Sequence, residues 1–309
     1  MAYIPAGEYV MGDHHDGMSD ALPVHAVYID GFWMDTYEVT NAQYAAGLNW
    51  ANGQGNLITV NANGIVYKAG SGTSYPYCAT TSASSYSRIT WNGSTFGVTV
   101  GKEAHPMVCV SWYGSVAYAN WRSAMEGKTP CYDLSTWTCN FGAGGYRLPT
   151  EAEWEKAARG GNYTPYYRYP WGNSLIATIA NYSGSGDPYE VSPSPYTTPA
   201  GFYTGALHQK ATFNWPGSQT SYQTSNGKNG WGLYDMAGNV YEWCNDWYSS
   251  TYYSSSPYDN PKGPTSGTYR VLRGGSWYFS SIILRCADRY YDAYPDYWYY
   301  FNGFRLALD

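Results

Sequence analysis

One stretch near the carboxyl end decides the fold: Arg270-Val-Leu-Arg-Gly-Gly-Ser-Trp277, then YFSSIILRCADRYYDAYPDYWYYF over residues 278–301, then Gly303-Phe-Arg-Leu-Ala307. The two outer segments combine glycine turns with short apolar runs, which is typical of strands in a buried sheet. Between them, eight of the twelve residues from Tyr290 to Phe301 are Tyr, Trp or Phe. The pattern predicts an aromatic surface segment between two core strands, called the tract below (residues 278–301).

The tyrosines of the tract favour a binding surface over a buried core. Tyrosine offers a large amphipathic contact area with only two side-chain torsions to immobilise, so binding surfaces are rich in it. A core made of the six tyrosines from Tyr290 to Tyr300 would need a partner for each hydroxyl. Each hydroxyl left unsatisfied costs about 1–3 kcal/mol. We therefore interpret the tract as exposed, with an aromatic core as the alternative.

The composition indicates a folded, turn-rich chain. Of its 309 residues, 44% are hydrophobic, 19% aromatic and 13% charged, with 35 Gly and 17 Pro. Disordered chains are rich in charge and poor in aromatics, so we expect a globule with few long helices. The 17 basic and 23 acidic residues give a formal charge of −6 without a basic run, so nucleic acid is not an expected partner.

Membrane insertion is not expected, because no apolar stretch approaches the ~18 residues of a membrane span. No secretory signal is recognisable at the amino end either.

The cysteines and histidines lack the spacing of a disulfide framework or a metal site. Six cysteines are few for this length, and none form a Cys-x-x-Cys pair. Cys131 and Cys139 flank a short polar connection, and whether they are bridged is left open. The five histidines include no His-x-x-x-His pair. No nucleophile elbow, phosphate loop or closely spaced pair of catalytic carboxylates is evident.

Local signals predict three helices and two amino-terminal strands. Thr40 and Thr150 each open a capping box, Ser111 is a helix cap, and Gly127 and Gly160 are helix stops. The helices are expected at 41 to about 50, 112–126 and 151–159, and the strands at 4–12 and 24–33.

Residues 51–104 are rich in Gly, Ser, Thr and Asn with short alternating apolar runs, which predicts hairpins inserted between the first two helices. Several prolines between 162 and 227 exclude long regular elements there. No repeat or linker divides the chain, so a single domain over 1–309 is expected, with 51–104 as its insertion.

Seven segments, in order along the whole chain, resemble the formylglycine-generating-enzyme (sulfatase-modifying factor) family. The resemblance implies that family's fold, which is α+β: an elaborated C-type-lectin fold with little regular secondary structure. Within these segments, an Arg147 pair with Glu153 or Glu155 and the buried rings of Trp154, Trp243 and Trp277 are expected to be scaffold. The segments are Ile4-Pro-Ala-Gly-Glu-Tyr-Val-Met-Gly12, Tyr37-Glu-Val-Thr-Asn41, His105-Pro-Met-Val-Cys-Val-Ser-Trp112, Tyr146-Arg-Leu-Pro-Thr-Glu-Ala-Glu-Trp-Glu155, Gly232-Leu-Tyr-Asp-Met-Ala-Gly-Asn-Val-Tyr-Glu-Trp243, Arg273-Gly-Gly-Ser-Trp277 and Gly303-Phe-Arg305.

The family's enzymes bind copper through two cysteines that follow the Gly-Gly-Ser motif, and this chain departs from that pattern. Its only cysteine in that interval is Cys286, within Leu284-Arg-Cys-Ala-Asp-Arg289. A copper(I) site needs at least two soft ligands within reach. No copper is therefore expected, and Cys286 is interpreted as a structural thiol.

The same resemblance implies two structural calcium sites built from side-chain and backbone oxygens. For the second, the alternative is that Asn239 and Glu242 only brace a turn. The first set is Asn181, Tyr182, Asp187 and Tyr189, and the second is Asn239, Val240 and Glu242.

The tract also resembles the variable segment of the lectin-fold variable proteins of diversity-generating retroelements. Such segments lie between Gly-Gly-Ser-Trp and Gly-Phe-Arg and arise from asparagine-type codons scrambled at adenines, which never give Lys, Glu, Gln, Met or Trp. Residues 278–301 contain no Lys, Glu, Gln or Met, and Trp298 is expected to be framework or an exception.

That second resemblance implies that 278–301 is a variable ligand-binding region in which fixed residues pin the backbone and the others meet the ligand. The expected fixed set is Leu284, Arg285, Cys286, Ala287, Arg289, Pro295 and Asp296. The expected ligand-binding set is Tyr278, Phe279, Ser280, Ile282, Ile283, Asp288, Tyr290, Tyr291, Asp292, Ala293, Tyr297, Tyr299, Tyr300 and Phe301.

The favoured function is therefore a non-enzymatic binding protein whose partner is a protein or other macromolecule on a cell surface. Exposure on a surface, such as that of a virus particle, would suit this role. The alternatives are a copper-dependent oxidase of the formylglycine-generating kind and a calcium-dependent glycan-binding lectin.

Overall fold

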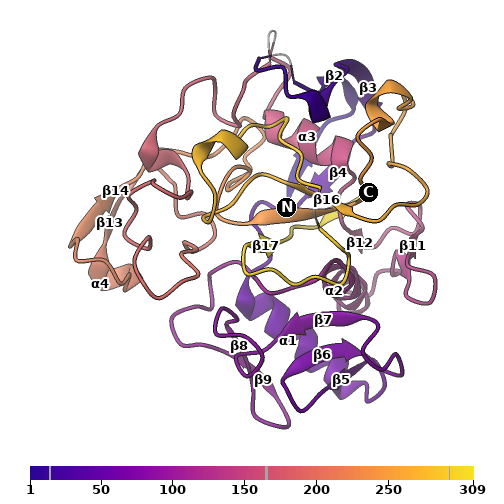
Figure 1. Ribbon diagram of the computed structural model, residues 1–309, viewed down its shortest axis with the longest axis vertical. Helices are drawn as coiled ribbons and strands as arrows, with labels where there is room; N and C mark the ends of the chain where they lie inside the picture. Colours follow the sequence, from indigo (N-terminus) through magenta and orange to yellow (C-terminus); the bar gives the residue numbers. More distant parts are fainter. Residues whose placement is uncertain (14, 164–165, 292) are drawn as a thin grey trace.

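The three predicted helices are present in the computed structural model, which describes residues 1–13, 15–163, 166–291 and 293–309 (Figure 1). Helices α1 (Asn41–Gly53) and α3 (Glu151–Arg159) begin with the predicted capping boxes at Thr40 and Thr150. Helix α2 (Trp112–Met125) begins where the Ser111 hydroxyl accepts a hydrogen bond from the Gly114 amide. Helix α3 ends at Gly160, whose φ of 70° suits glycine because it has no Cβ.

Each of the two predicted amino-terminal strands is broken into two. The first becomes β1 (Ala2–Ile4) and β2 (Gly7–Met11), and the second becomes β3 (His25–Ile29) and β4 (Phe32–Met34). The breaks are at residues 5–6 and 30–31, which include Pro5 and Gly31. The two halves of each predicted strand therefore join different sheets. Strands β2 and β3 pair with each other, whereas β1 and β4 join the central antiparallel sheet with β18 (Ala307–Leu308) and β12 (Tyr146–Arg147), in the order β1-β4-β18-β12.

A second sheet holds both ends of the tract. Its order is β16 (Arg270–Arg273), β15 (Tyr241–Trp247) and β17 (Asn302–Gly303), with β15 antiparallel to β16 and parallel to β17. Strand β16 lies before the tract in sequence and β17 directly after it. The tract therefore leaves one side of β15 and returns on the other.

The insertion forms the predicted hairpins and packs into the same apolar core as α1 and α2. Its buried Val66, Tyr77, Ile89 and Phe96 belong to one cluster with Trp112 of α2. Figure 1 shows it in purple at one end of the molecule, with the yellow tract between it and β16. Its strands are β5 (Ile58–Val60), β6 (Ile65–Lys68), β7 (Pro76–Ala79), β8 (Ile89–Trp91) and β9 (Phe96–Val98).

The remaining elements are short. Cys131 and Cys139 are both free, because β10 and β11 pair in a register that sets Tyr132, not Cys131, opposite Cys139. The elements are β10 (Tyr132–Asp133), β11 (Thr138–Cys139), β13 (Leu207–Gln209), α4 (Lys210–Phe213), β14 (Ser221–Gln223) and the 3-10 turns Ser19–Ala21, Ala177–Ile179, Tyr252–Ser254 and Ser281–Ile283. In the described part of the chain, no helix has the length and apolar character needed to cross a membrane.

The ion pair and the buried tryptophans expected of the scaffold are present. As predicted, Arg147 pairs with Glu153 at 2.6 Å, and Trp154, Trp243 and Trp277 are buried. Glu155 is not part of that pair, since its carboxylate contacts Arg159 and Arg273.

Candidate functional site

The backbone of the tract is hydrogen-bonded to the sheet beneath it. Tyr290 and Leu272 of β16 exchange two main-chain hydrogen bonds of 3.0 and 3.1 Å. Nearby, the carbonyl of Ala293 accepts from the amide of Arg270, and the carbonyl of Phe301 accepts from the amide of Tyr241. These bonds use only main-chain atoms, so they do not depend on which side chains the tract carries.

Further main-chain bonds fix the tract to loops that border it. The carbonyls of Phe279 and Tyr299 accept from the amides of Ser183 and Cys109 at 2.9 and 3.1 Å, respectively. Cys109 also has φ of 56°, a left-handed conformation uncommon for a residue with a side chain. The tract is thus an irregular loop with a defined backbone path.

Four of the residues expected to be fixed are buried, namely Leu284, Cys286, Ala287 and Arg289. The Arg289 guanidinium donates to Glu151 at 2.6 Å. Burial alone would raise the pKa of Glu151, but the charges of Arg289 and Arg273 outweigh it and lower that pKa. Arg285 is only half-buried, and it pairs with Asp16 at 3.0 Å.

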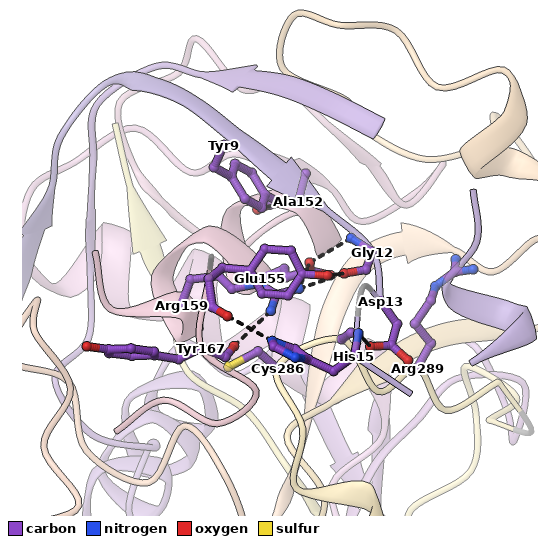
Figure 2. A network of polar contacts seen from close by, with 12 residues as sticks. Tyr9, Gly12, Asp13, His15, Ala152, Glu155, Arg159, Tyr167, Cys286 and Arg289 are labelled. Carbon is purple, nitrogen blue, oxygen red and sulfur yellow. Dashed lines mark hydrogen bonds and ion pairs between the residues drawn. The ribbon is translucent and has the colours of Figure 1, made fainter. Parts of the chain in front are cut away.

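Beneath these residues lies the polar network drawn in Figure 2. Glu155 accepts from the amide of Gly12 at 2.9 Å and from Arg159 at 2.7 Å, and it also pairs with Arg273. Arg273 in turn donates to the carbonyls of Cys286 and Ala287 in the tract. Burial raises the pKa of the Cys286 thiol to about 12, which keeps it protonated and supports its interpretation as a structural residue.

Most of the predicted ligand-binding side chains reach the surface. Tyr278 is 47% exposed, Ile282 63% and Tyr291 51%, and Ser280 and Tyr297 are exposed as well. The half-buried members are Phe279, Ile283, Tyr290, Tyr299 and Tyr300.

Three predicted ligand-binding residues are buried, so their assignment to the outer surface is wrong. Ala293 lies at the β16 edge, where its carbonyl is bonded to Arg270. The Phe301 ring packs against the rings of Phe279 and Tyr299. Asp288 lies near Tyr241 and Arg273, and burial raises the pKa of its carboxyl to about 7. Asp292 lies outside the described residues.

Tyrosines of the tract stack on aromatic side chains from elsewhere in the chain. Tyr291 stacks on Tyr248, with ring centroids 4.9 Å apart, and Tyr300 stacks on Tyr86 at 4.2 Å. Aromatic stacking adds about 0.5–1.5 kcal/mol beyond burial. The stacked partners hold the exposed Tyr291 ring and the half-buried Tyr300 ring in place.

Two hollows open beside the tract, on either side of the Tyr86–Tyr300 stack. The larger, of about 560 Å³, lies between residues 296–300 and the insertion, and the smaller, of about 280 Å³, lies between Tyr278 and the loop 183–196. The larger is lined by Tyr67, Pro76, Ser84, Tyr86, Cys109, Asp296, Tyr297, Trp298, Tyr299 and Tyr300.

The insertion residues of this site were missed from the sequence. Tyr67 and Tyr86 stand out as aromatic residues in a Gly- and Ser-rich segment, but more than two hundred residues separate them from Tyr297 to Tyr300. The Tyr86–Tyr300 stack and the main-chain bond between Cys109 and Tyr299 hold that end of the insertion against the tract.

The residues predicted to bind calcium are engaged mainly with one another and with their neighbours. Asp187 accepts hydrogen bonds from Ser185 and from the amide of Tyr189, and burial raises the pKa of its carboxyl to about 6. Asn181 donates to the Tyr196 carbonyl and to the side chain of Asn239. The carbonyl of Tyr182 accepts from the amide of Ser185.

At the second predicted calcium site, both oxygens of Glu242 are bound by Arg305 at 2.6–2.9 Å. A cation there would have to displace that guanidinium, and Val240 contributes a buried apolar side chain. Across the described ranges, no group of three or more His, Cys, Asp or Glu side chains is placed to hold a metal ion. The calcium sites stay predictions.

A family model matches the whole chain. It is described as the sulfatase-modifying factor enzyme 1-like domain, and it covers residues 1–309. The formylglycine-generating enzyme of Streptomyces coelicolor is 32% identical, with 94% of this chain and 80% of that enzyme aligned. The serine/threonine-protein kinase Pkn1 of Chlamydia trachomatis is 34% identical over 94% of this chain. This chain spans 35% of the length of that kinase.

Among solved structures, Treponema denticola variable protein 1 matches with a TM-score of 0.64 and 25% identity, covering 100% of this chain and 94% of that protein. The predicted α+β fold, an elaborated C-type-lectin fold of the formylglycine-generating type, is confirmed by these matches.

Proposed function

The chain belongs to the sulfatase-modifying factor enzyme 1-like family, and within that family we propose that it is a non-enzymatic binding protein. Its ligand-binding surface is the tract, and the tract is diversified in the manner of retroelement variable proteins. The similarity to Treponema denticola variable protein 1 supports this proposal over an enzymatic one.

One observation carries the proposal: main-chain bonds hold the tract in place while most of the side chains predicted to meet the ligand reach the surface. Tyr290, Ala293 and Phe301 are fixed to β15 and β16 through amides and carbonyls. Replacing an exposed side chain such as Tyr291 removes no such bond, so the backbone path survives the replacement. A surface of this kind tolerates many sequences, which is what diversification requires.

The chemistry of the tract suits recognition of a macromolecule. Exposed Tyr278, Tyr291 and Tyr297 offer broad amphipathic contact at a low cost in side-chain entropy. The surface is open, so it accommodates a protein surface better than it encloses a small molecule. We propose a receptor displayed on a cell as the partner, with the protein itself exposed on a surface such as a virus particle.

A direct test uses the fluorescently labelled chain on a panel of bacterial cells, measured by flow cytometry. The variant Tyr278→Ser, Tyr291→Ser, Tyr297→Ser is expected to lose binding to the cells that the parent labels. A matched control, Tyr3→Ser, Tyr163→Ser, Tyr258→Ser, removes three exposed tyrosines outside the tract and should bind as the parent does. Equal binding by both triple variants would contradict the proposal.

A second test is genetic. The flanking DNA is expected to carry an imperfect repeat of the tract whose differences are confined to adenines. A locus without such a repeat or a reverse transcriptase would count against diversification, while leaving the binding test unaffected.

The kinship with formylglycine-generating enzymes favours one alternative, a copper-dependent oxidase. Against it, the interval after the Gly-Gly-Ser motif has one cysteine, Cys286, and that thiol is fully buried beside Arg159. Stoichiometric copper together with turnover of a cysteine-containing sulfatase peptide would establish the oxidase instead.

Structural calcium also remains part of the proposal, with the site around Asp187 as the better candidate because burial raises the pKa of that carboxyl and a cation would oppose the rise. Adding calcium is expected to raise the melting temperature, and Asp187→Asn should abolish that rise. Glycan binding that disappears on chelation would point to the remaining alternative, a calcium-dependent lectin.

A further inference from the structure

The larger hollow has walls of two different origins. One wall is the tract from Asp296 to Tyr300, and the other is the insertion, through Tyr67, Pro76 and Tyr86. The Tyr86 and Tyr300 rings close one end by stacking at 4.2 Å. The bond between the Cys109 amide and the Tyr299 carbonyl holds the two walls together through the main chain.

Much of this lining lies outside the positions expected to vary. Tyr67, Pro76 and Tyr86 are not in the tract, and Asp296 belongs to the set predicted to be fixed. Replacement of the variable tyrosines would therefore leave an aromatic wall and a carboxylate in place. This wall and its carboxylate are the constant part of the hollow, whereas Tyr297, Tyr299 and Tyr300 belong to the set expected to vary.

The charged side chains that line the two hollows are acidic. Asp296 lines the larger and Glu190 the smaller, and within the described part of the chain neither hollow is lined by Lys or Arg. The Arg88 guanidinium donates to the carbonyls of Ser85, Ser87 and Ser194, and Ser194 lines the smaller hollow. The hollow therefore offers a carboxylate and ring faces to an incoming cation.

The chain already holds a cation of its own in a comparable way. The Lys68 amino group lies 5.6 Å from the ring centre of Tyr75 and 5.7 Å from that of Trp137. Attraction to an aromatic face is worth about 0.5–1 kcal/mol at exposed sites, and more where water is excluded.

We propose that the larger hollow is a constant anchor that takes an arginine or lysine side chain from a loop of the partner protein, an inference that rests on the proposed binding function. The cation would lie against Tyr67, Tyr86 and Trp298, which are outside the set expected to vary, and pair with Asp296. The variable side chains around it would then select among partners that share this basic residue.

The test titrates the 15N-labelled 309-residue chain with N-acetyl-arginine amide and follows the indole N–H signal of Trp298, assigned by comparison with Trp298→Phe. N-acetyl-citrulline amide, which has nearly the same shape without the charge, is the matched probe. The arginine probe is expected to shift the signal saturably at millimolar concentration, and the citrulline probe to bind at least about fivefold more weakly. Raising the salt concentration should weaken binding of the arginine probe but not binding of the citrulline probe.

Two variants locate the effect. Asp296→Asn should weaken binding of the arginine probe about fivefold. The melting temperature should not change, since the Asp296 side chain is exposed. Asp259→Asn removes an exposed carboxylate far from the hollow and should change nothing. The anchor proposal would be overturned if the parent bound both probes equally well. It would also be overturned if Asp296→Asn bound the arginine probe as tightly as the parent does.

Failure of the anchor and failure of the proposed function are distinguishable. If labelled chain binds cells through the tract but Asp296→Asn binds them equally well, the anchor is wrong and the binding function stands. If the arginine probe binds as expected while the tract variant labels cells as the parent does, the proposed function is wrong.

Discussion

The tract and the strand pair beneath it are stabilised by opposite kinds of contact. In β15 and β16, side chains make the decisive bonds: Glu242 of β15 binds Arg305 and the Trp154 indole, and Arg273 of β16 binds Glu155. In the tract, main-chain amides and carbonyls make most of them. The difference teaches that side-chain identity is essential in the strand pair and replaceable at the exposed positions of the tract.

The same division runs through the tract itself. Arg289 and Cys286 are buried and anchor it, whereas Tyr291 and Ile282 are exposed. Four predictions test this division, in order of expected effect on stability.

The largest loss is expected for Arg289→Ala. This guanidinium is buried and pairs with Glu151 at 2.6 Å, so its removal leaves a buried carboxylate without this partner. Breaking such a pair costs about 3–5 kcal/mol, and we expect the lower end because Arg273 remains 3.5 Å from Glu151. The free energy of unfolding in urea is the measurement. A loss below 1 kcal/mol would place Arg289 among the replaceable residues.

The difference in stability between Asp288→Asn and the parent is expected to depend on pH. Burial raises the pKa of this carboxyl to about 7, while Arg273 and Arg285 lower it less. Between about pH 4 and 7 the folded chain therefore retains a proton that the unfolded chain has lost, and stability falls as the pH rises. The asparagine variant lacks this loss.

From pH 5 to pH 8, the stability of Asp288→Asn relative to the parent should rise by an amount on the order of 2 kcal/mol. The other buried carboxyls are the same in both chains, so their contributions cancel. Unfolding midpoints in urea at pH 5, 6, 7 and 8 give the comparison. A constant offset across this range would mean that Asp288 is not the buried acid described above.

A small effect is expected for the tract variant Tyr278→Ser, Tyr291→Ser, Tyr297→Ser. These rings are largely exposed, so its stability should stay within about 1 kcal/mol of the parent. Thermal melting measures this, and a shift of more than a few degrees would show that the rings belong to the core. The companion variant Tyr290→Ser, Tyr299→Ser, Tyr300→Ser should lose more, because these three are half-buried.

The smallest loss of stability is expected for Arg285→Ala. Arg285 lies in the tract like Arg289, but its partner Asp16 is exposed enough for solvent to screen the pair. Such pairs contribute about 0–1 kcal/mol. The ratio between the Arg289 and Arg285 effects is therefore the sharpest single measure of the difference between anchoring and replaceable positions.

The local signals in the sequence were sufficient for the helices and for the family fold. Thr40, Ser111, Thr150 and Gly160 fix helix ends through contacts within a few residues, and such contacts do not depend on the rest of the fold. The breaks within the amino-terminal strands were not predicted, because β1 and β4 join a sheet completed by residues near 146 and 307.

Within the tract, the sequence separated most inward from outward residues but misplaced Asp288, Ala293 and Phe301. Asp, Ala and Phe are all residue types that the proposed codon scrambling can produce, so composition does not set these three apart. Their burial follows from where the loop crosses β15 and β16, which no local pattern records.

By itself, the sequence determined the fold family, the helix ends and the position of an aromatic tract between two framework strands, because each is encoded by neighbouring residues. Only the tertiary structure decided that Tyr67 and Tyr86 face Asp296 to Tyr300 across a hollow. It also decided which tract residues are covered. Both depend on main-chain bonds between residues far apart in the chain, which form only once the whole domain has folded.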